Sequence, residues 1–505
     1  MLVKTFSGAI IGLEGKIIEI EVNTSFGLRR FEIVGLPDKV VEESKERITI
    51  AIESSGYKSP SKQPIKILVS LAPAELKKEG AIYDLPIALG YLLSIGEIKF
   101  DPRGKLIFGE LGLDGKIKPI KGAILFALLA KEKNFSEIIV PNENFLEASL
   151  IEGIKVIGVG TLKEAIEYLE GKRKFQKEKI NFESVFQKKE NLEELGLIKG
   201  QEVAKRALQI SAAGNHHLLM VGPPGVGKTL LAKALSFLLP PLSFEESLEV
   251  TKIYSIAGLL PPNIPLISKR PFRAPHHTAS EVALIGGGNP PKPGEITLAH
   301  RGVLFLDEFP EFHRDVLESL RQPIEEGKIT ISRAKHSITF PASFTLVAAA
   351  NPCPCGYYGE EDKECKCSFS QIQKYQRKLR GPLIDRIDIF LHLSLVKYEK
   401  LKSEDSKNWV IEAKERIQKA REIQKLRFGT EKTNSQMTLS EIQKYCKIDQ
   451  KSEMLLKEYV NSGKLSLRGY HKVLKLARTI ADLEGKEKIS FENVCEALGY
   501  REKEI

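Results

Sequence analysis

The sequence predicts a multidomain α/β protein with an N-terminal α+β domain, a central α/β domain around a parallel sheet, and a C-terminal helical bundle. Three observations lead to this expectation. Residues 1–170 alternate short strands with helices, residues 218–235 read as strand, glycine-rich loop and helix, and strand patterns end near residue 400. A chain of 505 residues also exceeds one hydrophobic core and suggests about three domains.

Composition and charge are those of a globular protein with an anionic partner. Hydrophobic residues make up 42% and charged residues 28% of the chain, which is ordinary for globular domains. The net charge of +10 favours a partner such as nucleic acid, although a lysine-rich surface explains it almost as well. No run is long enough to cross a membrane, and Met1–Phe6 leads into strand-like alternation instead of a signal-peptide core. The chain is therefore expected in the cytoplasm.

Short alternating elements fill the predicted first domain, residues 1–170. Period-two runs bounded by turn residues predict strands, and longer apolar-periodic runs predict helices. The strands are expected at 16–22, 31–34, 65–71, 106–111, 138–140 and 156–159, and the helices at 38–55 and 85–93. Residues 171–190 follow with seven basic and three acidic side chains and read as a linker, either a solvated tether or an arm that touches DNA.

The segment Leu218–Thr229 predicts a phosphate-binding loop. An apolar run reads as a buried strand, opens into Gly-Pro-Pro-Gly-Val-Gly-Lys-Thr, and is followed by a helical pattern. The glycines let successive backbone N–H groups converge on phosphate oxygens at a helix N-terminus. Lys228 is expected to reach the β- and γ-phosphates, and Thr229 to bind Mg²⁺. The predicted ATP-binding residues of this loop are Gly222, Pro223, Pro224, Gly225, Val226, Gly227, Lys228 and Thr229.

Polar residues follow two later strands of the same domain. The apolar run Val303–Leu306 predicts a buried parallel strand, and Asp307 and Glu308 come directly after it. Asp307 is expected to hold the Mg²⁺ shell, and Glu308 to polarise the attacking water. Strand 344–350 ends at Asn351, whose amide can hydrogen-bond the water or the γ-phosphate. These residues complete a predicted site for ATP hydrolysis.

Two further residues are candidates at this site. Arg386 precedes the last predicted strand, 389–393, where its guanidinium could stabilise transition-state charge on a neighbouring subunit's γ-phosphate. An internal salt bridge, for example with Asp385, is the alternative. Gln201, next to Gly200, stands before the helix that leads into the phosphate loop and is a candidate for contact with the adenine.

Four of the six cysteines lie within residues 353–367 and indicate a metal site. Two Cys-x-Cys pairs separated by a turn suit tetrahedral Zn²⁺, with free thiols or redox-active pairs as alternatives. A bound zinc ion would fix the conformation of the loop that directly follows Asn351. The predicted ligands are Cys353, Cys355, Cys365 and Cys367. Cys446 and Cys495 lie on helical patterns and are expected to be buried.

Other motifs of the central domain carry weaker expectations. The glycine- and proline-rich stretch 259–294 looks like an inserted loop. His276 and His277 are adjacent on an extended segment, so their side chains point apart, and a structural role is favoured over a metal site. Segments 328–332 and 336–340 alternate with period two and predict a β-hairpin with a basic tip.

From about residue 399 to 505 only helical patterns remain. Their apolar spacing predicts a small bundle, and Ser490 is a plausible N-cap of its last helix. The helices are expected at 410–428, 440–446, 452–460, 467–483 and 491–498.

Three runs, 271–280, 286–295 and 298–308, resemble the ComM (YifB) family of AAA+ ATPases, which are related to the magnesium-chelatase ATPase subunit. The resemblance covers nearly the whole chain. It implies a Lon-like domain at 1–170, a linker at 171–190, an AAA+ motor at 191–398 and a helical domain at 399–505. It further implies a hexameric ring that drives branch migration of DNA during recombination, notably in natural transformation.

The resemblance also assigns individual residues. Arg468 matches the second sensor arginine, and pore-facing hairpins in related proteins make Arg333 and Lys335 candidates for gripping DNA phosphates, with a solvated hairpin tip as the alternative. Asp84 and Ile124 stand where Lon-type peptidases carry their catalytic serine and lysine. No peptidase activity is therefore expected. The alternative function is a magnesium-chelatase-type ATPase motor that remodels a protein or metal-insertion partner.

Overall fold

The computed structural model describes residues 1–174, 198–261, 264–288, 291–333, 336–360, 363–379, 381, 383–395 and 406–501, without the side chains of 333, 336 and 406–408. The chain forms two compact units, each with its own hydrophobic core. The first unit takes Met1–Gln187 and Ser247–Ile267, and the second takes Lys188–Glu246 and Ser268–Ile505. Most of the predicted linker, residues 175–190, lies outside the described residues.

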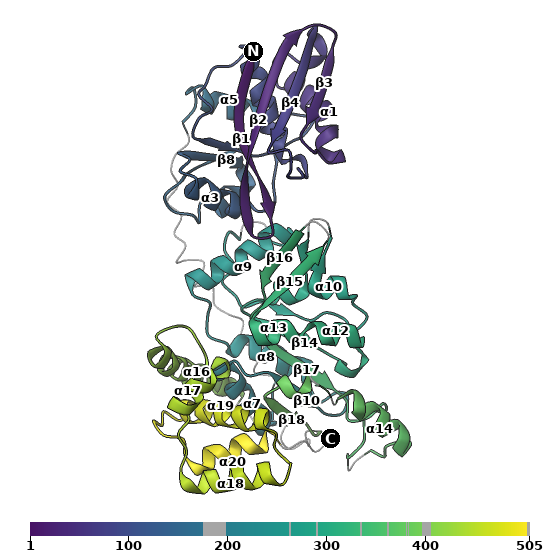
Figure 1. Ribbon diagram of the computed structural model, residues 1–505, viewed down its shortest axis with the longest axis vertical. Coiled ribbons are helices and arrows are strands. Elements are labelled where there is room, and N and C mark those ends of the chain that lie inside the picture. The colour runs from purple at the N-terminus through teal and green to yellow at the C-terminus, as the bar shows by residue number, and fades with distance from the viewer. Residues whose placement is uncertain are drawn as a thin grey trace. The chain divides into compact units, whose positions relative to one another are not determined.

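The first unit combines a four-stranded sheet, a three-stranded sheet and the antiparallel pair β6–β7 with helices (Figure 1). The larger sheet has the order β1-β2-β4-β3 and is antiparallel except for the β3–β4 pair, whereas the smaller sheet β5-β8-β9 is parallel. The predicted helices are confirmed, and Asp38 caps the first of them by accepting from the Val41 N–H. The predicted strands are confirmed too, although 106–111 divides into two short ones. The elements are β1 (Leu2–Ile11), β2 (Glu14–Phe26), β3 (Arg30–Val34), α1 (Lys39–Ser54), β4 (Ile65–Ala72), α2 (Asp84–Ser94), β5 (Lys105–Ile107), β6 (Glu110–Leu111), β7 (Ile117–Lys118), α3 (Ala123–Glu132), β8 (Glu137–Pro141), α4 (Phe145–Ala148), β9 (Lys155–Val159) and α5 (Leu162–Leu169).

Helix α2 begins at a buried carboxylate. Asp84 accepts hydrogen bonds from Arg47 Nε at 2.9 Å, from the Leu111 N–H at 3.3 Å and from the Ser44 hydroxyl. Burial raises the pKa of Asp84 above its ordinary value, while Arg47 and Ser44 act in the opposite direction. Ile124 on α3 is fully buried in an apolar cluster. The two positions that the resemblance compares with a peptidase dyad are thus an ion-paired carboxylate and a core residue.

Helix α9 (Phe244–Ala257) contributes its residues from Ser247 onward to the first unit. The Ser255 hydroxyl donates to the carboxylate of Glu147 and accepts from the Gly122 N–H at 2.9 Å. Ile256 packs against the same apolar cluster as the core of α3. The sequence did not predict that a segment between the phosphate loop and the carboxylate strand joins the N-terminal unit, because this packing depends on contacts more than 100 residues apart.

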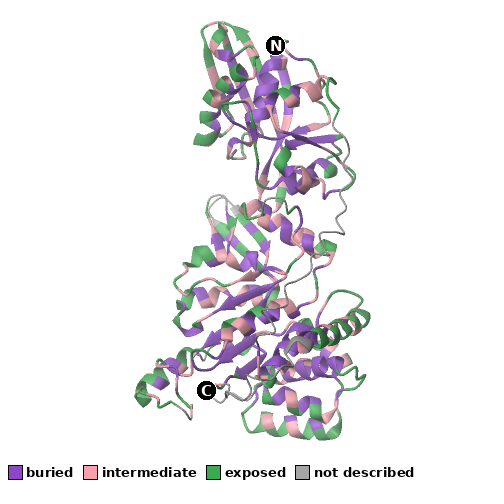
Figure 2. Cartoon of the chain, turned by 180° about the vertical axis from the view of Figure 1, so that it is seen from behind, coloured by how far each residue is buried: buried purple, intermediate pink, exposed green. Residues whose placement is uncertain are grey.

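A five-stranded parallel sheet is the centre of the second unit, and its three central strands are buried throughout (Figures 1 and 2). Its order is β11-β14-β17-β10-β18. The predicted strands 218–221, 303–306, 344–350 and 389–393 are confirmed. The edge strand β11 was missed because it has only two residues and lies in the stretch expected to be an inserted loop. The strands are β10 (Leu218–Val221), β11 (Phe272–Arg273), β14 (Val303–Leu306), β17 (Thr345–Ala350) and β18 (Ile389–His392).

Helices, a hairpin and short elements complete this part of the second unit. Strands β15 (Lys328–Arg333) and β16 (His336–Pro341) pair in antiparallel register, which confirms the predicted hairpin. The stretch expected as a loop carries short pieces of regular structure beside β11. The remaining elements are α7 (Glu202–Gly214), α8 (Lys228–Leu238), α10 (Glu281–Ile285), β12 (Gly286–Gly287), β13 (Lys292–Pro293), α11 (Glu295–Leu298), α12 (Arg314–Ser319), α13 (Arg321–Glu326) and α14 (Phe369–Lys378).

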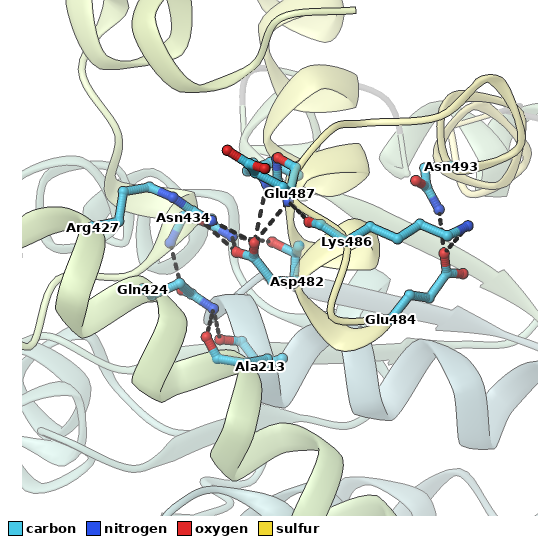
Figure 3. A network of polar contacts seen from close by, with 12 residues as sticks. Ala213, Gln424, Arg427, Asn434, Asp482, Glu484, Lys486, Glu487 and Asn493 are labelled. Atoms are coloured by element: carbon cyan, nitrogen blue, oxygen red, sulfur yellow. Dashed lines mark hydrogen bonds and ion pairs between the residues drawn. The ribbon is translucent and has the colours of Figure 1, made fainter.

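The C-terminal helices form the predicted bundle, and a buried carboxylate lies at its centre (Figure 3). Asp482 accepts from Arg427 and from Asn434 Nδ2, both at 2.8 Å, while Gln424 donates to the Ala213 carbonyl of α7 at 3.0 Å. The helices are α16 (Ser406–Phe428), α17 (Leu439–Tyr445), α18 (Gln450–Asn461), α19 (Leu467–Leu483) and α20 (Phe491–Gly499), with Ser490 as the predicted N-cap of α20.

The two remaining cysteines differ in exposure. Cys446 is buried as expected, but Cys495 is exposed, so that expectation was wrong. On α20 the inward face is formed by Val494, Ala497 and Leu498, and the helical period turns Cys495 away from it. Among the described residues, no helix has both the length and the apolar character that a membrane crossing requires.

Candidate nucleotide site

The predicted phosphate loop joins β10 to α8. Gly225 and Gly227 have φ angles of 85° and 86°, a left-handed conformation that glycine adopts without strain. A Cβ atom on Gly222 would lie 2.6 Å from the Leu393 carbonyl oxygen, so only glycine fits there. The loop therefore has the backbone curvature that a phosphate cradle at the N-terminus of α8 requires.

The Lys228 ammonium lies inside this loop. Its Nζ donates to the carbonyl oxygens of Gly222 and Pro223 at 2.6 and 3.1 Å and to Asn351 Oδ1 at 2.9 Å. Burial lowers the pKa of Lys228, and the charge of Asp307 opposes this shift. An anion bound in the loop would favour the charged ammonium, as a phosphate group does.

Two carboxylates follow β14 at the same place. Thr229 Oγ1 donates to Asp307 Oδ2 at 3.3 Å, so the two predicted Mg²⁺ ligands are neighbours. A hydroxyl beside a carboxylate is the oxygen pair that Mg²⁺ takes from such a loop. Glu308 has a left-handed backbone with φ of 50°, and its Oε2 lies 2.9 Å from His277 Nδ1. His277 therefore holds the predicted water-polarising residue.

Strand register explains why these groups meet. Strands β10, β14 and β17 are parallel, with Val221 opposite Ala350 and Leu306 opposite Ala348. The loop after β10, the carboxylates after β14 and Asn351 after β17 therefore lie at one carboxyl edge of the sheet, where open α/β sheets bind ligands. The structure thus brings together the phosphate loop, Asp307, Glu308 and Asn351.

The two predicted arginines lie elsewhere. Arg386 Nη2 and Arg468 Nη2 both contact Glu325 Oε1, at 2.6 and 2.9 Å. A cavity of about 680 Å³ is lined by these three side chains together with residues that precede β10, β17 and β18. The arginines therefore lie at the amino edge of the sheet, opposite the phosphate loop. The internal salt bridge considered for Arg386 does form, with Glu325.

The four clustered cysteines are close enough to share one metal ion. Their sulfur atoms all lie within 4.8 Å of one another. The Sγ–Sγ distances are 3.3 Å for Cys353–Cys355, 3.7 Å for Cys353–Cys365 and 3.6 Å for Cys355–Cys365. Tetrahedral zinc with Zn–S bonds of about 2.3 Å separates its ligands by about 3.8 Å. A hydrogen bond from the Tyr357 N–H lowers the pKa of the Cys355 thiol to about 6, whereas the pKa values of Cys365 and Cys367 are raised, the latter chiefly by burial. The residues fit a zinc ion.

The cysteine loop touches the phosphate loop directly. A Cβ atom on Gly356, whose φ is 89°, would lie 2.7 Å from Pro224 Cδ. Cys353 follows Asn351 by two residues, and Asn351 accepts from Lys228. The conformation of the cysteine loop and that of the nucleotide site are therefore connected by packing and by chain continuity.

For three other predicted residues the structure gives less information about the site. Gln201 adopts a left-handed conformation at the N-cap of α7, and its Nε2 donates to the Ser394 carbonyl at 2.9 Å. Arg333 ends β15, so its backbone stands at the hairpin tip. Lys335 lies outside the described residues.

Sequence reasoning missed two residues of the site, His277 and Glu325. His277 was assigned a structural or loop-contact role without its partner Glu308. Glu325 was not considered, because an acidic residue near the end of a helix is common and no motif marks it. Its contact with Arg468 joins residues 143 positions apart.

Similarity to known proteins extends over nearly the whole chain. The family model described as magnesium chelatase, subunit ChlI, matches residues 194–401, the model for subunit ChlI of Mg-chelatase matches 20–144, and the model of the ChlI C-terminal region matches 409–501. The competence protein ComM of Haemophilus influenzae is 42% identical over 505 residues, covering 98% of this chain and 96% of that protein. The YifB protein of Escherichia coli is 40% identical over 503 residues, with the same coverage. Lon protease 2 of Bacillus subtilis is 28% identical over 183 residues, which are 31% of this chain and 32% of that protein.

Proposed function

Because the chain belongs to the ComM and YifB family of magnesium-chelatase-like AAA+ ATPases, we propose that it is an ATP-driven motor that moves branched DNA in recombination during natural transformation. One observation carries the proposal: the residues expected to act on ATP lie apart, with the phosphate loop and carboxylates at one edge of a sheet and Arg386 and Arg468 at the other. The likeness to a competence protein over 98% of the chain supports the biological process.

A divided site calls for a second copy of the chain. Strands β10 and β18 pair in parallel from Leu218 opposite Ile389 to Val221 opposite His392. At about 3.3 Å per residue, the amino and carboxyl edges of the sheet are therefore about 10 Å apart along these strands. Arg386 and Arg468 therefore serve the γ-phosphate of a neighbouring subunit. Repeating this head-to-tail contact around a closed axis gives a ring, which we propose to be a hexamer.

The residues at the carboxyl edge divide the chemistry among them. The loop N–H groups and Lys228 bind the phosphates, and Thr229 and Asp307 hold Mg²⁺, which neutralises charge on the phosphate oxygens when it is bound. Glu308 polarises the attacking water, and Asn351 hydrogen-bonds the water or the γ-phosphate. The arginines of the neighbour stabilise the charge that develops in the transition state.

Contact with DNA is assigned to the hairpin tip. We expect branched DNA to raise the ATPase rate of the full chain, and the double variant Arg333→Ala/Lys335→Ala to lose this stimulation while retaining its rate without DNA. Two lost phosphate contacts should also reduce the slope of log affinity against log salt by about 1.4 to 1.8. ATPase assays with and without a four-way junction, and binding titrations at several salt concentrations, measure both effects.

Lys328→Ala, at the base of the same hairpin with a half-exposed side chain, is the matched control and should behave as wild type. Unchanged branch migration by the double variant would contradict the assignment of the tip. The absence of both DNA stimulation and low-salt DNA binding in the wild-type chain would favour the second candidate function, an ATPase that remodels a protein or metal-insertion partner. The matches to magnesium-chelatase models support that candidate.

A structural zinc ion is proposed for Cys353, Cys355, Cys365 and Cys367. Elemental analysis of protein purified without chelator should give close to one zinc per chain, and Cys365→Ser should remove it. Because Gly356 packs on Pro224, loss of zinc should lower kcat for ATP hydrolysis about tenfold or more through misplaced loop atoms. Cys495→Ser, at an exposed cysteine outside the cluster, should change neither quantity. Zinc-free wild-type protein with full activity would contradict the proposal.

For the domain organisation we propose the boundaries expected from the sequence, a Lon-like domain at 1–170, a linker at 171–190, the motor at 191–398 and a helical domain at 399–505, except that Ser247–Ile267 belongs to the first compact unit. Partial likeness to Lon protease 2 supports the first assignment. Because Asp84 is bound to Arg47 and Ser44, it has no role as a nucleophile, and we propose that this domain serves assembly or substrate binding without peptidase activity. The motor is placed in the cytoplasm, where DNA and ATP are available.

A further inference from the structure

Glu325 contacts both predicted site arginines, Arg386 and Arg468, through the same carboxylate oxygen. Its Oε1 lies 2.6 Å from Arg386 Nη2 and 2.9 Å from Arg468 Nη2. Arg386 is 8% exposed and Arg468 54% exposed, so one guanidinium comes from the interior and the other from the surface. Two guanidinium groups this close repel each other, and the shared carboxylate compensates for the repulsion.

The backbone beside Arg386 is fixed independently of Glu325. Lys472 on α19 donates to the Arg386 carbonyl and to Asp388 Oδ1, both at 2.6 Å, and Arg501 donates to the Ile387 carbonyl at 2.5 Å. These contacts hold the segment before β18 against the helical bundle. Glu325 acts at the other end of the Arg386 side chain, where it orients the Arg386 guanidinium within the cavity at the amino edge.

Glu325 is also next to the hairpin in the chain. It is the penultimate residue of α13, which ends at Gly327 with φ of 65°. The Gly327 N–H donates to the Pro323 carbonyl at 2.9 Å, and the Gly327 carbonyl accepts from the Ala342 N–H at 2.8 Å, where the second hairpin strand ends. One tight turn therefore joins β15 to the helix whose Glu325 carboxylate contacts both arginines.

We propose that Glu325 is a positioning residue that orients Arg386 and Arg468 toward the γ-phosphate of the neighbouring subunit and couples this orientation to the state of the hairpin. The inference rests on the proposed divided ATP site. Contact of nucleic acid with the hairpin of one subunit then alters the arginines that this same subunit presents to the next ATP. Glu325 itself touches neither ATP nor DNA.

Mixed rings test this role. Lys228→Ala subunits keep the arginines but cannot hold ATP, and Arg386→Ala subunits keep the phosphate loop but lack an arginine. When the two are co-expressed, a divided site predicts that ATPase activity returns, because competent interfaces form between unlike subunits. Glu325→Gln is then placed in one partner at a time, which preserves side-chain shape and removes only the charge.

The Lys228→Ala partner supplies the arginines. In this partner, Glu325→Gln should lower kcat about tenfold or more and change KM for ATP little. It should also reduce the ratio of the DNA-stimulated ATPase rate to the basal rate toward one. In the Arg386→Ala partner the same substitution should cost at least several-fold less. Glu326→Gln, one residue along α13 with a carboxylate that accepts from Gln322, is the matched control and should retain the activity of the unsubstituted mixture in either partner.

The outcomes separate the two hypotheses. Equal loss from Glu325→Gln in both partners would overturn the positioning role and indicate a merely structural residue, while the recovered activity would still support the divided site. A mixture without any recovered ATPase activity would overturn the divided site and the positioning role together. Retained activity in one arrangement also demonstrates that the Glu325→Gln subunit folds and assembles.

Discussion

A Glu308→Gln variant is expected to bind ATP as tightly as the wild type and to hydrolyse it at least about 100-fold more slowly. The amide keeps the size of the side chain and can still bond to His277, but it cannot polarise a water molecule as a carboxylate does. Binding persists because the phosphate loop, Lys228 and Asp307 remain in place. Single-turnover hydrolysis and titration with a fluorescent ATP analogue separate the two properties.

Glu311→Gln is the matched control for this variant. Glu311 belongs to the same turn after β14, but its half-exposed side chain contacts Lys378 at 3.3 Å. It should hydrolyse ATP at the wild-type rate. If Glu308→Gln turned over ATP at nearly the wild-type rate, another group would have to polarise the water.

The Arg386→Ala variant should lose about 10³-fold in kcat while single subunits still bind ATP. The reason is the position of Arg386 at the sheet edge opposite its own phosphate loop, where its loss leaves the loop contacts intact. Steady-state ATPase assays, together with ATP binding measured at protein concentrations below and above assembly, test this expectation.

Arg321→Ala provides a control on the neighbouring helix α13, because Arg321 is exposed and pairs with Glu318 at 2.9 Å. Its kcat should match the wild type. Loss of ATP binding by isolated Arg386→Ala subunits would instead assign the arginine to its own subunit's site. An unchanged kcat would leave Arg386 as a structural partner of Glu325.

Much of the nucleotide site was predictable because its signals are local in sequence. A buried strand followed by Gly222–Thr229, or by Asp307 and Glu308, carries its own structural context in fewer than fifteen residues. Parallel strands then bring such ends to one edge without further information. The period-two hairpin and the apolar spacing of the C-terminal helices were predictable for the same reason.

The contacts that orient these groups were not predictable from local patterns. His277 meets Glu308, and Glu325 meets Arg386 and Arg468, only because the chain folds back over long separations. The resemblance likewise placed Asp84 at a former nucleophile position but did not identify Arg47 as its partner. Cys495 shows the opposite failure: its place on a helix was read as burial, although the helical period puts it off the face of Val494, Ala497 and Leu498.

The opposite edges of the five-stranded sheet have a consequence for energy use in the cell. If the proposed site is correct, a solitary subunit binds ATP at one edge of the sheet while its two arginines lie at the other, so it lacks the groups that complete hydrolysis. Under the proposed assembly, futile turnover is suppressed by dilution alone, without an inhibitor. The copy number of the protein, which sets how many rings form, then controls ATP consumption as directly as the supply of nucleotide does.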